Sequence, residues 1–333
     1  MNRKIFIAVM AAALAATSGC MRFPTYTVSS YDYERVESDL RVRALDTRMA
    51  WTRRVHTIGY RLMKAIPLEE RGNQHYLGML VSPLDEYVAR LYSMEESPRD
   101  VVVFGVIKGS PAEAAGFREK DIIRMIGRKP VTIHNFDALV LRMKAGTPVA
   151  FTIERDGTQT VVSMTPEALR YNVPFLVTDD HTVNTYASPS GITVTYGMLK
   201  FVQSDDELAM VMAHELAHLV HGQILRDRGF SLLSAIISIA IGQTRIPQAG
   251  DLSLADNTIA RDRFPGDFER EADRYGVLYA HTAGFDILNG MKVWERFGLE
   301  IPGSAETYIG ATQPVASERR QRLQGIADEI RNA

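Results

Sequence analysis

The spacing of apolar and polar positions divides the chain into segments of different structure. Between Tyr33 and Ile66 there is no proline, and apolar residues recur close to helical spacing, which predicts one long helix or two consecutive helices. From Gly72 to about Glu167 the pattern changes to short runs rich in β-branched residues, such as Val101-Val102-Val103-Phe104, broken by glycine and proline. The pair Asp156-Gly157 between two such runs is typical of a hairpin turn. The chain is therefore expected to combine a helical part with a compact β-rich part.

A further helix is sharply marked beyond the β-rich block. Ser204-Asp205-Asp206-Glu207 is a capping-box sequence, in which the serine and the glutamate satisfy free N–H groups of the first turn. Gly222 is a natural stop, so residues 214–221 are expected on a largely buried helix. The apolar run from Gly229 to Gly242 holds 14 residues without charge, too few to cross a bilayer. It predicts a helix packed on the core, with a hydrophobic lid over an active site as the alternative.

Composition narrows the class of protein. With 333 residues the chain is long enough for two domains of roughly 150 residues each. A net charge of −2 gives no attraction to nucleic acid along the whole chain. The helical segment from Arg41 to Lys64 nevertheless carries seven basic residues and one acid, Asp46. We interpret these as a solvated helix face, with contact to anionic lipid as the alternative.

The amino terminus has the pattern of a secretory signal. Arg3 and Lys4 precede an apolar run that ends in small residues before Cys20. Because this is the only cysteine, an intramolecular disulfide framework is excluded. Thr17-Ser18-Gly19-Cys20 resembles the lipobox of bacterial lipoproteins, which implies lipidation of Cys20 and a membrane anchor; a simple cleaved signal is the alternative. By the same resemblance, Met21 favours the outer membrane, facing the periplasm.

The residues that carry chemistry begin with His214-Glu215-Leu216-Ala217-His218. Histidines four apart lie on one helix face, so both can reach one cation while the glutamate reaches its bound water. A catalytic zinc needs a third protein ligand. One class of zinc enzyme has a third histidine six residues after the second. Here the position six residues after His218 is Ile224, so that ligand is absent. Glu269 and Asp273 lie four apart on one face of a later helix, whereas Glu271 points to a different face.

His214-Glu215-x-x-His218 followed by Glu269-x-x-Ala272-Asp273 resembles the CAAX prenyl endopeptidase (Ste-type) family of gluzincins, which includes HtpX and BepA. The resemblance implies one zinc ion per chain, held by the two histidines and Glu269. It also implies that Glu215 is the general base and that the carboxylate of Asp273 orients a ligand histidine. Many members have Thr-His-Pro near the carboxyl terminus where this chain has Thr312-Gln313-Pro314, so regulation by that histidine is in doubt.

The residues before the metal helix also resemble this family. The segment from Phe175 to Gly197 is similar to its pair of strands, with Asn184 near the middle. We therefore expect an edge strand that holds an extended substrate by main-chain pairing, formed by Asn184, Thr185, Tyr186 and Ala187.

The β-rich block resembles a PDZ domain. Its signature is Gly109-Ser110-Pro111-Ala112-Glu113-Ala114-Ala115-Gly116-Phe117 leading into Asp121-Ile122-Ile123. The resemblance implies that the loop matching Tyr76, Leu77, Gly78 and Met79 binds the carboxylate of a peptide, which then joins the sheet as an extra strand. A PDZ domain that only packs on its neighbour is the alternative.

Together these patterns predict an α+β fold, with a mainly helical gluzincin-type zinc peptidase domain containing a small β-sheet, and a β-rich PDZ domain. The expected divisions are a signal peptide (1–19), a linker (20–32), a helical segment of the peptidase domain (33–71), the PDZ domain (72–168) and the remaining peptidase domain (169–333).

The predicted function is that of a lipid-anchored zinc metalloendopeptidase of the bacterial cell envelope, acting in protein quality control. Its partners would be unfolded or misassembled polypeptides, recruited or gated by the PDZ domain, and the membrane, without nucleic acid. The alternative is a latent peptidase that works as a PDZ-based peptide-binding or chaperone-like module. The oligomeric state is not predicted.

Overall fold

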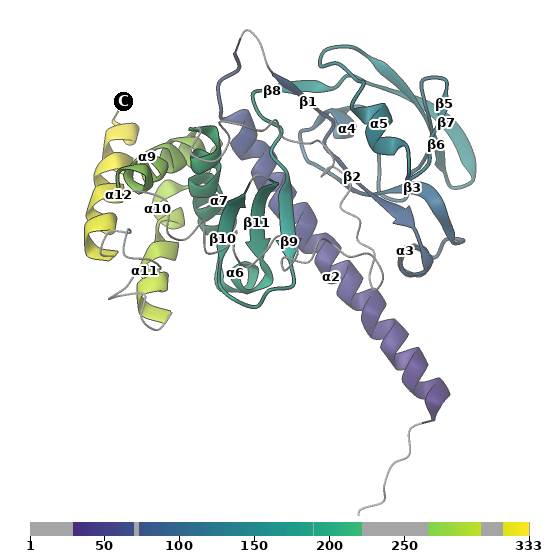
Figure 1. Cartoon of the computed structure of the whole chain (residues 1–333), viewed down its shortest axis with the longest axis horizontal. Helices are drawn as coiled ribbons and strands as arrows, with labels where there is room; N and C mark the ends of the chain where they lie inside the picture. Colours follow the sequence, from purple (N-terminus) through teal and green to yellow (C-terminus); the bar gives the residue numbers. More distant parts are fainter. Residues whose placement is uncertain (1–28, 70–72, 189, 222–265, 301–315, 333) are drawn as a thin grey trace, which may run out of the picture. The chain divides into compact units, whose positions relative to one another are not determined.

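The structure is a computed structural model that describes residues 29–69, 73–188, 190–221, 266–300 and 316–332 (Figure 1). The predictions for Cys20, for the apolar run 229–242 and for Gln313 lie outside the described residues. The chain separates into two compact units, residues 1–40 and 41–333. The described part of the first unit is the beginning of a helix with exposed apolar side chains.

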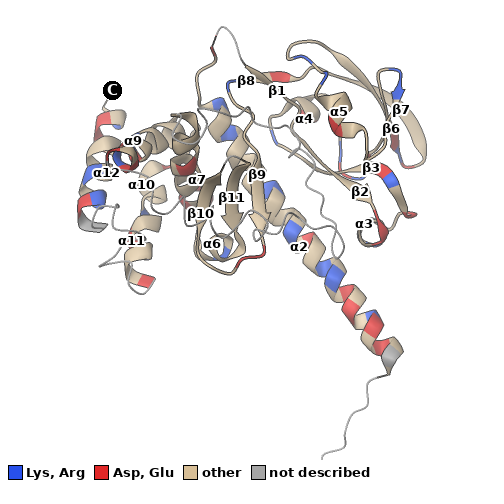
Figure 2. Cartoon of the chain, in the orientation of Figure 1, with Lys and Arg blue, Asp and Glu red and all other residues tan. Residues whose placement is uncertain are grey.

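Helix α2 (Ser30–Lys64) is one continuous helix, which settles the choice between one helix and two. In the second unit it contributes buried apolar residues at helical spacing, among them Leu45, Met49, Val55, Ile58 and Leu62. Acidic residues lie mostly in its first part and lysine and arginine mostly in the rest (Figure 2).

The predicted solvated face of α2 holds only in part. Arg41, Arg43 and Lys64 are exposed. The other basic residues are half-buried and donate to acceptors far along the chain, namely Arg48 to Asp179, Arg53 to the Phe104 carbonyl, Arg54 to Asp205 and Arg61 to the Ala283 carbonyl. These contacts join α2 to the first residue of the helix Asp205–Val220 and to segments before and after that helix.

The β-rich block forms a six-stranded sheet of order β2-β3-β4-β6-β7, with β5 beside β4. The strands are β2 (Met79–Leu84), β3 (Ser97–Val106), β4 (Ile122–Ile126), β5 (Lys129–Pro130), β6 (Val149–Arg155) and β7 (Thr158–Met164). The helices are α3 (Glu86–Tyr92), α4 (Pro111–Ala114) and α5 (Phe136–Val140). A separate pair, β1 (Gln74–Tyr76) and β8 (Glu167–Leu169), brings the two ends of the block together.

The turn between β6 and β7 follows the predicted signal. Asp156 and Gly157 have φ angles of 51° and 75°. Two successive positive φ values match the twist of antiparallel strands, so the predicted hairpin is confirmed.

The unbroken apolar run of β3 is explained by burial on both faces. Val101 and Val103 join the interior cluster of the sheet, whereas Val102 and Phe104 join the cluster that contains α2. Side chains of a strand alternate between faces, so a strand covered on both sides needs apolar residues throughout.

The remaining chain forms a small sheet and a set of helices (Figure 1). In the sheet, β11 (Gly191–Thr195) lies between antiparallel β10 (Thr185–Ser188) and parallel β9 (Phe175–Thr178). The helices are α6 (Tyr196–Phe201), α7 (Asp205–Val220), α9 (Gly266–Thr282), α10 (Ile287–Gly290), α11 (Lys292–Glu300) and α12 (Ala316–Arg331). The mixture confirms the predicted α+β class.

Helix α7 is the central element of this part. The Ser204 hydroxyl accepts the N–H of Glu207 at its amino terminus, as the capping-box sequence predicts. The helix packs on β10 and β11 and on α9. No described helix has both the length and the apolar character needed to cross a membrane.

Two helical glycines provide a matched test of this packing. A Cβ at Gly59 of α2 would lie 2.3 Å from Cε2 of the buried Phe175, whereas one at Gly325 of α12 would have open space. Gly59→Ala should therefore lower the free energy of unfolding by about 1 to 3 kcal/mol through overpacking. Gly325→Ala should raise it by up to about 1 kcal/mol through helix propensity. Urea denaturation of both variants measures the difference, and equal effects would contradict the packing of Phe175 on α2.

Candidate metal centre

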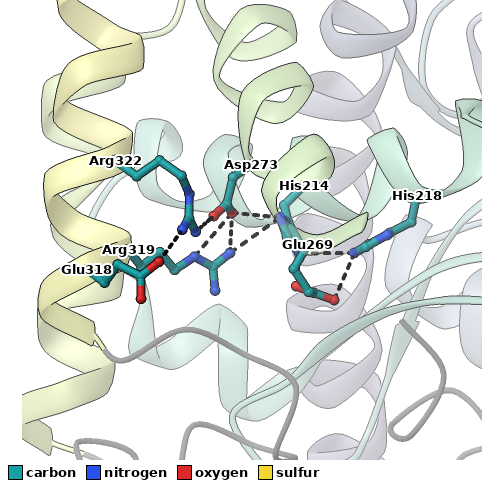
Figure 3. A network of polar contacts seen from close by, with 7 residues as sticks. All are labelled: His214, His218, Glu269, Asp273, Glu318, Arg319 and Arg322. Carbon is teal, nitrogen blue, oxygen red and sulfur yellow. Dashed lines mark hydrogen bonds and ion pairs between the residues drawn. The ribbon is translucent and has the colours of Figure 1, made fainter. Parts of the chain in front are cut away.

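The described residues contain one cluster of histidine and carboxylate side chains with metal-ligand geometry. His214 and His218 lie one turn apart on α7, and Glu269 reaches them from α9 (Figure 3). The exposed fractions of these residues are 5%, 2% and 4%. All three therefore meet in the protein interior.

The distances between the ligand atoms fit a single zinc ion. Nε2 of His214 lies 3.1 Å from Nε2 of His218 and 3.3 Å from Oε2 of Glu269, and Nε2 of His218 lies 3.5 Å from Oε1 of Glu269. Tetrahedral zinc with bonds of about 2.0 to 2.1 Å separates its ligand atoms by about 3.3 Å. The two histidines and Glu269 thus form a three-ligand set that leaves one position for water or substrate.

Gly276 allows α9, which carries Glu269, to lie close to α7, which carries the two histidines. A Cβ at Gly276 of α9 would lie 3.0 Å from the backbone nitrogen of His214. Larger residues would push α9 away and separate Glu269 from the histidines.

Behind the ligands, Asp273 joins three helices (Figure 3). Its Oδ1 lies 3.1 Å from Nδ1 of His214 and accepts from Nη2 of Arg319 at 2.5 Å. Its Oδ2 accepts from Nη2 of Arg322 at 2.7 Å. The guanidinium of Arg319 also lies 3.7 Å from the ring centroid of Trp294 on α11. The carboxylate therefore holds α12 and the ring of a zinc-ligand histidine in place.

The contacts among His214, Glu269 and Asp273 shift the pKa values of all three groups. Burial lowers the pKa of His214, but hydrogen bonds to Asp273 and Glu269 outweigh burial and raise it to about 9. Burial raises the pKa values of Glu269 and Asp273, but His214 and the charge of Arg319 bring both below their usual ranges. Both carboxylates consequently stay ionised, and such a site favours a cation.

Glu215 lies on the same helix beside the ligands. Its Oε2 accepts the backbone N–H of Ala187 in β10 at 2.9 Å. Burial raises the pKa of this carboxyl group to about 7. A glutamate with this pKa can accept and return a proton near neutral pH.

The other predicted site residues lie in three places. Asn184 precedes β10, which contains Thr185, Tyr186 and Ala187. Glu271 lies outside the metal cluster, with Oε1 4.0 Å from Nδ1 of His221. The loop Tyr76–Met79 belongs to the β-rich block, where Tyr76 ends β1 and Met79 begins β2.

Two residues of the site were not anticipated. Arg322 and Trp294 reach it through Asp273 and Arg319, from segments outside the ligand motifs. Arg322 lies three residues after Arg319 and hence on the same helix face, which is the signal in the sequence that could have found it.

Comparison with known proteins identifies both parts of the chain. A PDZ domain model matches residues 76–165, and the model of peptidase family M48 matches residues 153–327. With the metal cluster, these matches define a zinc-dependent metallopeptidase that carries a PDZ domain. The chain belongs to peptidase family M48, which confirms the resemblance found from the His214–His218 motif.

Several curated proteins are similar over parts of the chain. Mitochondrial metalloendopeptidase OMA1 of Arabidopsis thaliana is 30% identical over 149 residues, 44% of this chain and 30% of that protein. A putative beta-barrel assembly-enhancing protease of Vibrio cholerae is 28% identical over 123 residues, 34% of this chain and 25% of that protein. The chain therefore spans less than a third of the length of these relatives.

Two solved structures are similar to part of the chain. The HtrA-type protease AlgW with a decapeptide covers 30% of this chain and 30% of that chain, with 22% identity and a TM-score of 0.27. The HtrA3 PDZ domain bound to a phage-derived ligand covers 29% of this chain and 88% of that chain, with 19% identity and a TM-score of 0.25.

The role of Asp273 can be tested through zinc affinity. Asp273→Asn should weaken zinc binding by about 10- to 100-fold, because the amide holds the ring of His214 less firmly than the carboxylate. Competition with a chromophoric chelator measures the affinity. Asp267→Asn, at an exposed position of the same helix, is the control and should leave it unchanged. Equal affinities in the two variants, both folded by circular dichroism, would show that Asp273 does not orient His214.

Proposed function

We propose that this chain is a zinc-dependent endopeptidase of the bacterial cell envelope that hydrolyses unfolded or misassembled envelope proteins. The observation that carries the proposal is the buried cluster of His214, His218 and Glu269 with Glu215 beside it. The names of the two curated relatives, a metalloendopeptidase and an assembly-enhancing protease, support the same reaction.

The residues divide the work of peptide hydrolysis. His214, His218 and Glu269 would hold zinc, which supplies polarisation of the scissile carbonyl and a lowered pKa for attacking water. Glu215 accepts the proton of the water as it attacks the carbonyl carbon, and returns a proton to the amine as the C–N bond breaks. Asp273 keeps His214 in the orientation that ligation requires.

Strand β10 is suited to hold an extended substrate. It lies at one edge of its sheet, and the N–H of Ala187 points away from β11 toward Glu215. Because backbone directions alternate along a strand, the N–H of Thr185 also points outward. An unfolded segment can pair with this edge, whereas a folded protein offers no free strand.

The proposal also covers where the enzyme is located and how it recruits substrates. Lipidation of Cys20 would anchor the enzyme to the membrane, with the outer membrane favoured by Met21. The loop formed by Tyr76, Leu77, Gly78 and Met79 would bind peptide carboxylates and recruit or gate substrates.

Glu215→Gln tests the enzymatic function. The amide cannot take a proton, so hydrolysis should fall by at least about a hundredfold while zinc content stays the same. New protein amino termini are compared in cell envelopes that contain the wild type or the variant at equal abundance. Glu271→Gln, outside the metal cluster, is the matched control and should keep the wild-type pattern. Identical cleavage patterns for wild type and Glu215→Gln would favour the latent, peptide-binding alternative.

Thr185→Pro tests the edge strand. Proline removes one outward N–H without breaking the ladder to β11, since proline is tolerated where the N–H faces away from the sheet. The KM for an unstructured peptide should rise by about fivefold, the loss expected for one hydrogen bond. Thr185→Val keeps the N–H and removes only the hydroxyl, so its KM should stay near that of the wild type. Unchanged turnover by the proline variant would exclude pairing at this residue.

A further inference from the structure

Strand β7 is the last strand in the order of the six-stranded sheet, and among the described strands it pairs only with β6. Five of its seven residues are exposed, and Val161 is 66% exposed. Natural edge strands are commonly protected by lysine, by proline or by a bulge. The segment Thr158–Met164 contains neither residue, and its pairing with β6 has no register shift. This edge is therefore open to another strand.

The main chain of β7 presents hydrogen-bonding groups along this edge. In a hairpin with a two-residue turn, the residues that flank the turn exchange hydrogen bonds, here Arg155 and Thr158, and every second pair repeats the pattern. The residues of β7 that direct N–H and C=O groups away from β6 are therefore Gln159, Val161 and Ser163. The contact from the Gly127 N–H to the Ala150 carbonyl agrees with this assignment. Ala150 lies opposite Ser163 and uses its carbonyl on the side of β4.

An antiparallel copy of the same strand fits these groups. When Val161 lies opposite Val161 of the partner subunit, Gln159 lies opposite Ser163 of the partner subunit. Every outward N–H then has an outward C=O opposite it, because a two-fold interface uses the same surface on both chains. No residue of the segment Thr158–Met164 is charged, so the strands bring no like charges together.

The charges just beyond β7 favour the antiparallel arrangement. In this register the exposed turn residue Asp156 lies opposite Pro166 of the partner subunit. The carbonyl of Pro166 accepts the N–H of Gly146 at 2.8 Å, two residues after the exposed Lys144. Each chain thus brings a lysine to the end of the strand where the other chain has an aspartate. A parallel pairing in register would instead bring the two Asp156 side chains together.

The side chains of β7 also match across such an interface. Met164 belongs to the interior cluster of the sheet and Val162 packs against that cluster. Val161 therefore faces the outer side of the sheet, since side chains alternate along a strand. On that side Val161 is in register with Thr152 of β6. Pairing by two-fold symmetry places Thr152, Val161 and their two counterparts in one row of β-branched side chains, which pack well across strands.

We propose that β7 is a self-association surface, at which two copies of this chain form one continuous antiparallel sheet centred on Val161. The occupant is a second copy because the strand is neutral, complementary to itself and flanked by charges of opposite sign at its two ends. Strand β2 is at the other end of the strand order, so its edge stays free in the dimer. A dimer of this kind carries two metal centres, so two segments of one long polypeptide can be engaged at the same time. The association itself does not rest on the proposed peptidase function.

Co-purification tests the association. Two full-length, zinc-loaded chains with different affinity tags are produced in one cell and extracted in detergent, and the wild-type pair should co-purify. Val161→Lys places two positive charges directly opposite each other, so co-purification should fall by about fivefold or more. Leu141→Lys, at an exposed apolar position of the same β-rich block, is the matched control and should behave as the wild type. Wild-type chains that do not associate, or Val161→Lys chains that associate like the wild type, would overturn the proposal.

A charge-exchange pair tests the two-fold register. Val161→Glu alone should also weaken association, whereas Val161→Glu on one tagged chain and Val161→Lys on the other should restore it, because residue 161 lies opposite itself. Val161→Pro removes only the outward N–H, keeps the ladder to β6 and should weaken association by about fivefold. Failure of the Glu and Lys chains to associate, with both folded by circular dichroism, would overturn the two-fold pairing.

Cross-linking distinguishes a second copy from an unfolded polypeptide at the same edge. Ser163→benzoylphenylalanine is introduced into the full chain, and the cell envelopes are irradiated. The product should have twice the mass of the chain, with the cross-link in the segment Thr158–Met164 of the partner. Cross-links to other polypeptides only would overturn the second copy as the occupant.

Discussion

The metal centre depends on one buried negative charge, the carboxylate of Asp273, being neutralised from three sides. Only 3% of this residue is exposed, and an unpaired charge at such a depth would cost several kcal/mol. Its partners are His214 on α7 and two arginines on α12, so the carboxylate that contacts a member of the histidine–glutamate cluster also joins three helices. The orientation of the His214 ring and the packing of α7, α9 and α12 therefore depend on the same carboxylate.

The same constraint explains why the carboxyl-terminal helix belongs to the site although it supplies no ligand. Arg319 is 3% exposed, and its guanidinium is held between Asp273 and the ring of Trp294. An arginine buried in this way needs both its ion pair and its aromatic neighbour, since each alone leaves part of the desolvation uncompensated. Helix α11, which carries Trp294, is thereby tied to the metal centre as well.

Features that depend on neighbouring residues were predictable from the sequence. Ser204 caps α7 and Asp156-Gly157 turns the β6–β7 hairpin, because a cap or a turn is decided by adjacent residues. Helical periodicity predicted that His214 and His218 share one helix face, and the family resemblance implied that Glu269 would join them. The partners of the α2 arginines were not predictable, since Asp179, Asp205 and the Ala283 carbonyl come close only after folding. The pairing of Arg322 with Asp273 has the same origin.

Helix α2 shows why the two domains cannot be treated as independent. Its residue Leu62, Phe104 of the PDZ sheet and Phe175 of the peptidase sheet belong to one hydrophobic cluster. Gly59 on the same helix leaves the space that the ring of Phe175 occupies, and Arg53 donates to the Phe104 carbonyl at 2.8 Å. A shared core of this kind makes the stability of each domain depend on the other, because apolar surface buried at their junction is exposed when either unfolds. A cavity lined by His56 of α2 and by the loop Tyr76–Met79 lies at this junction, so its walls come from both domains.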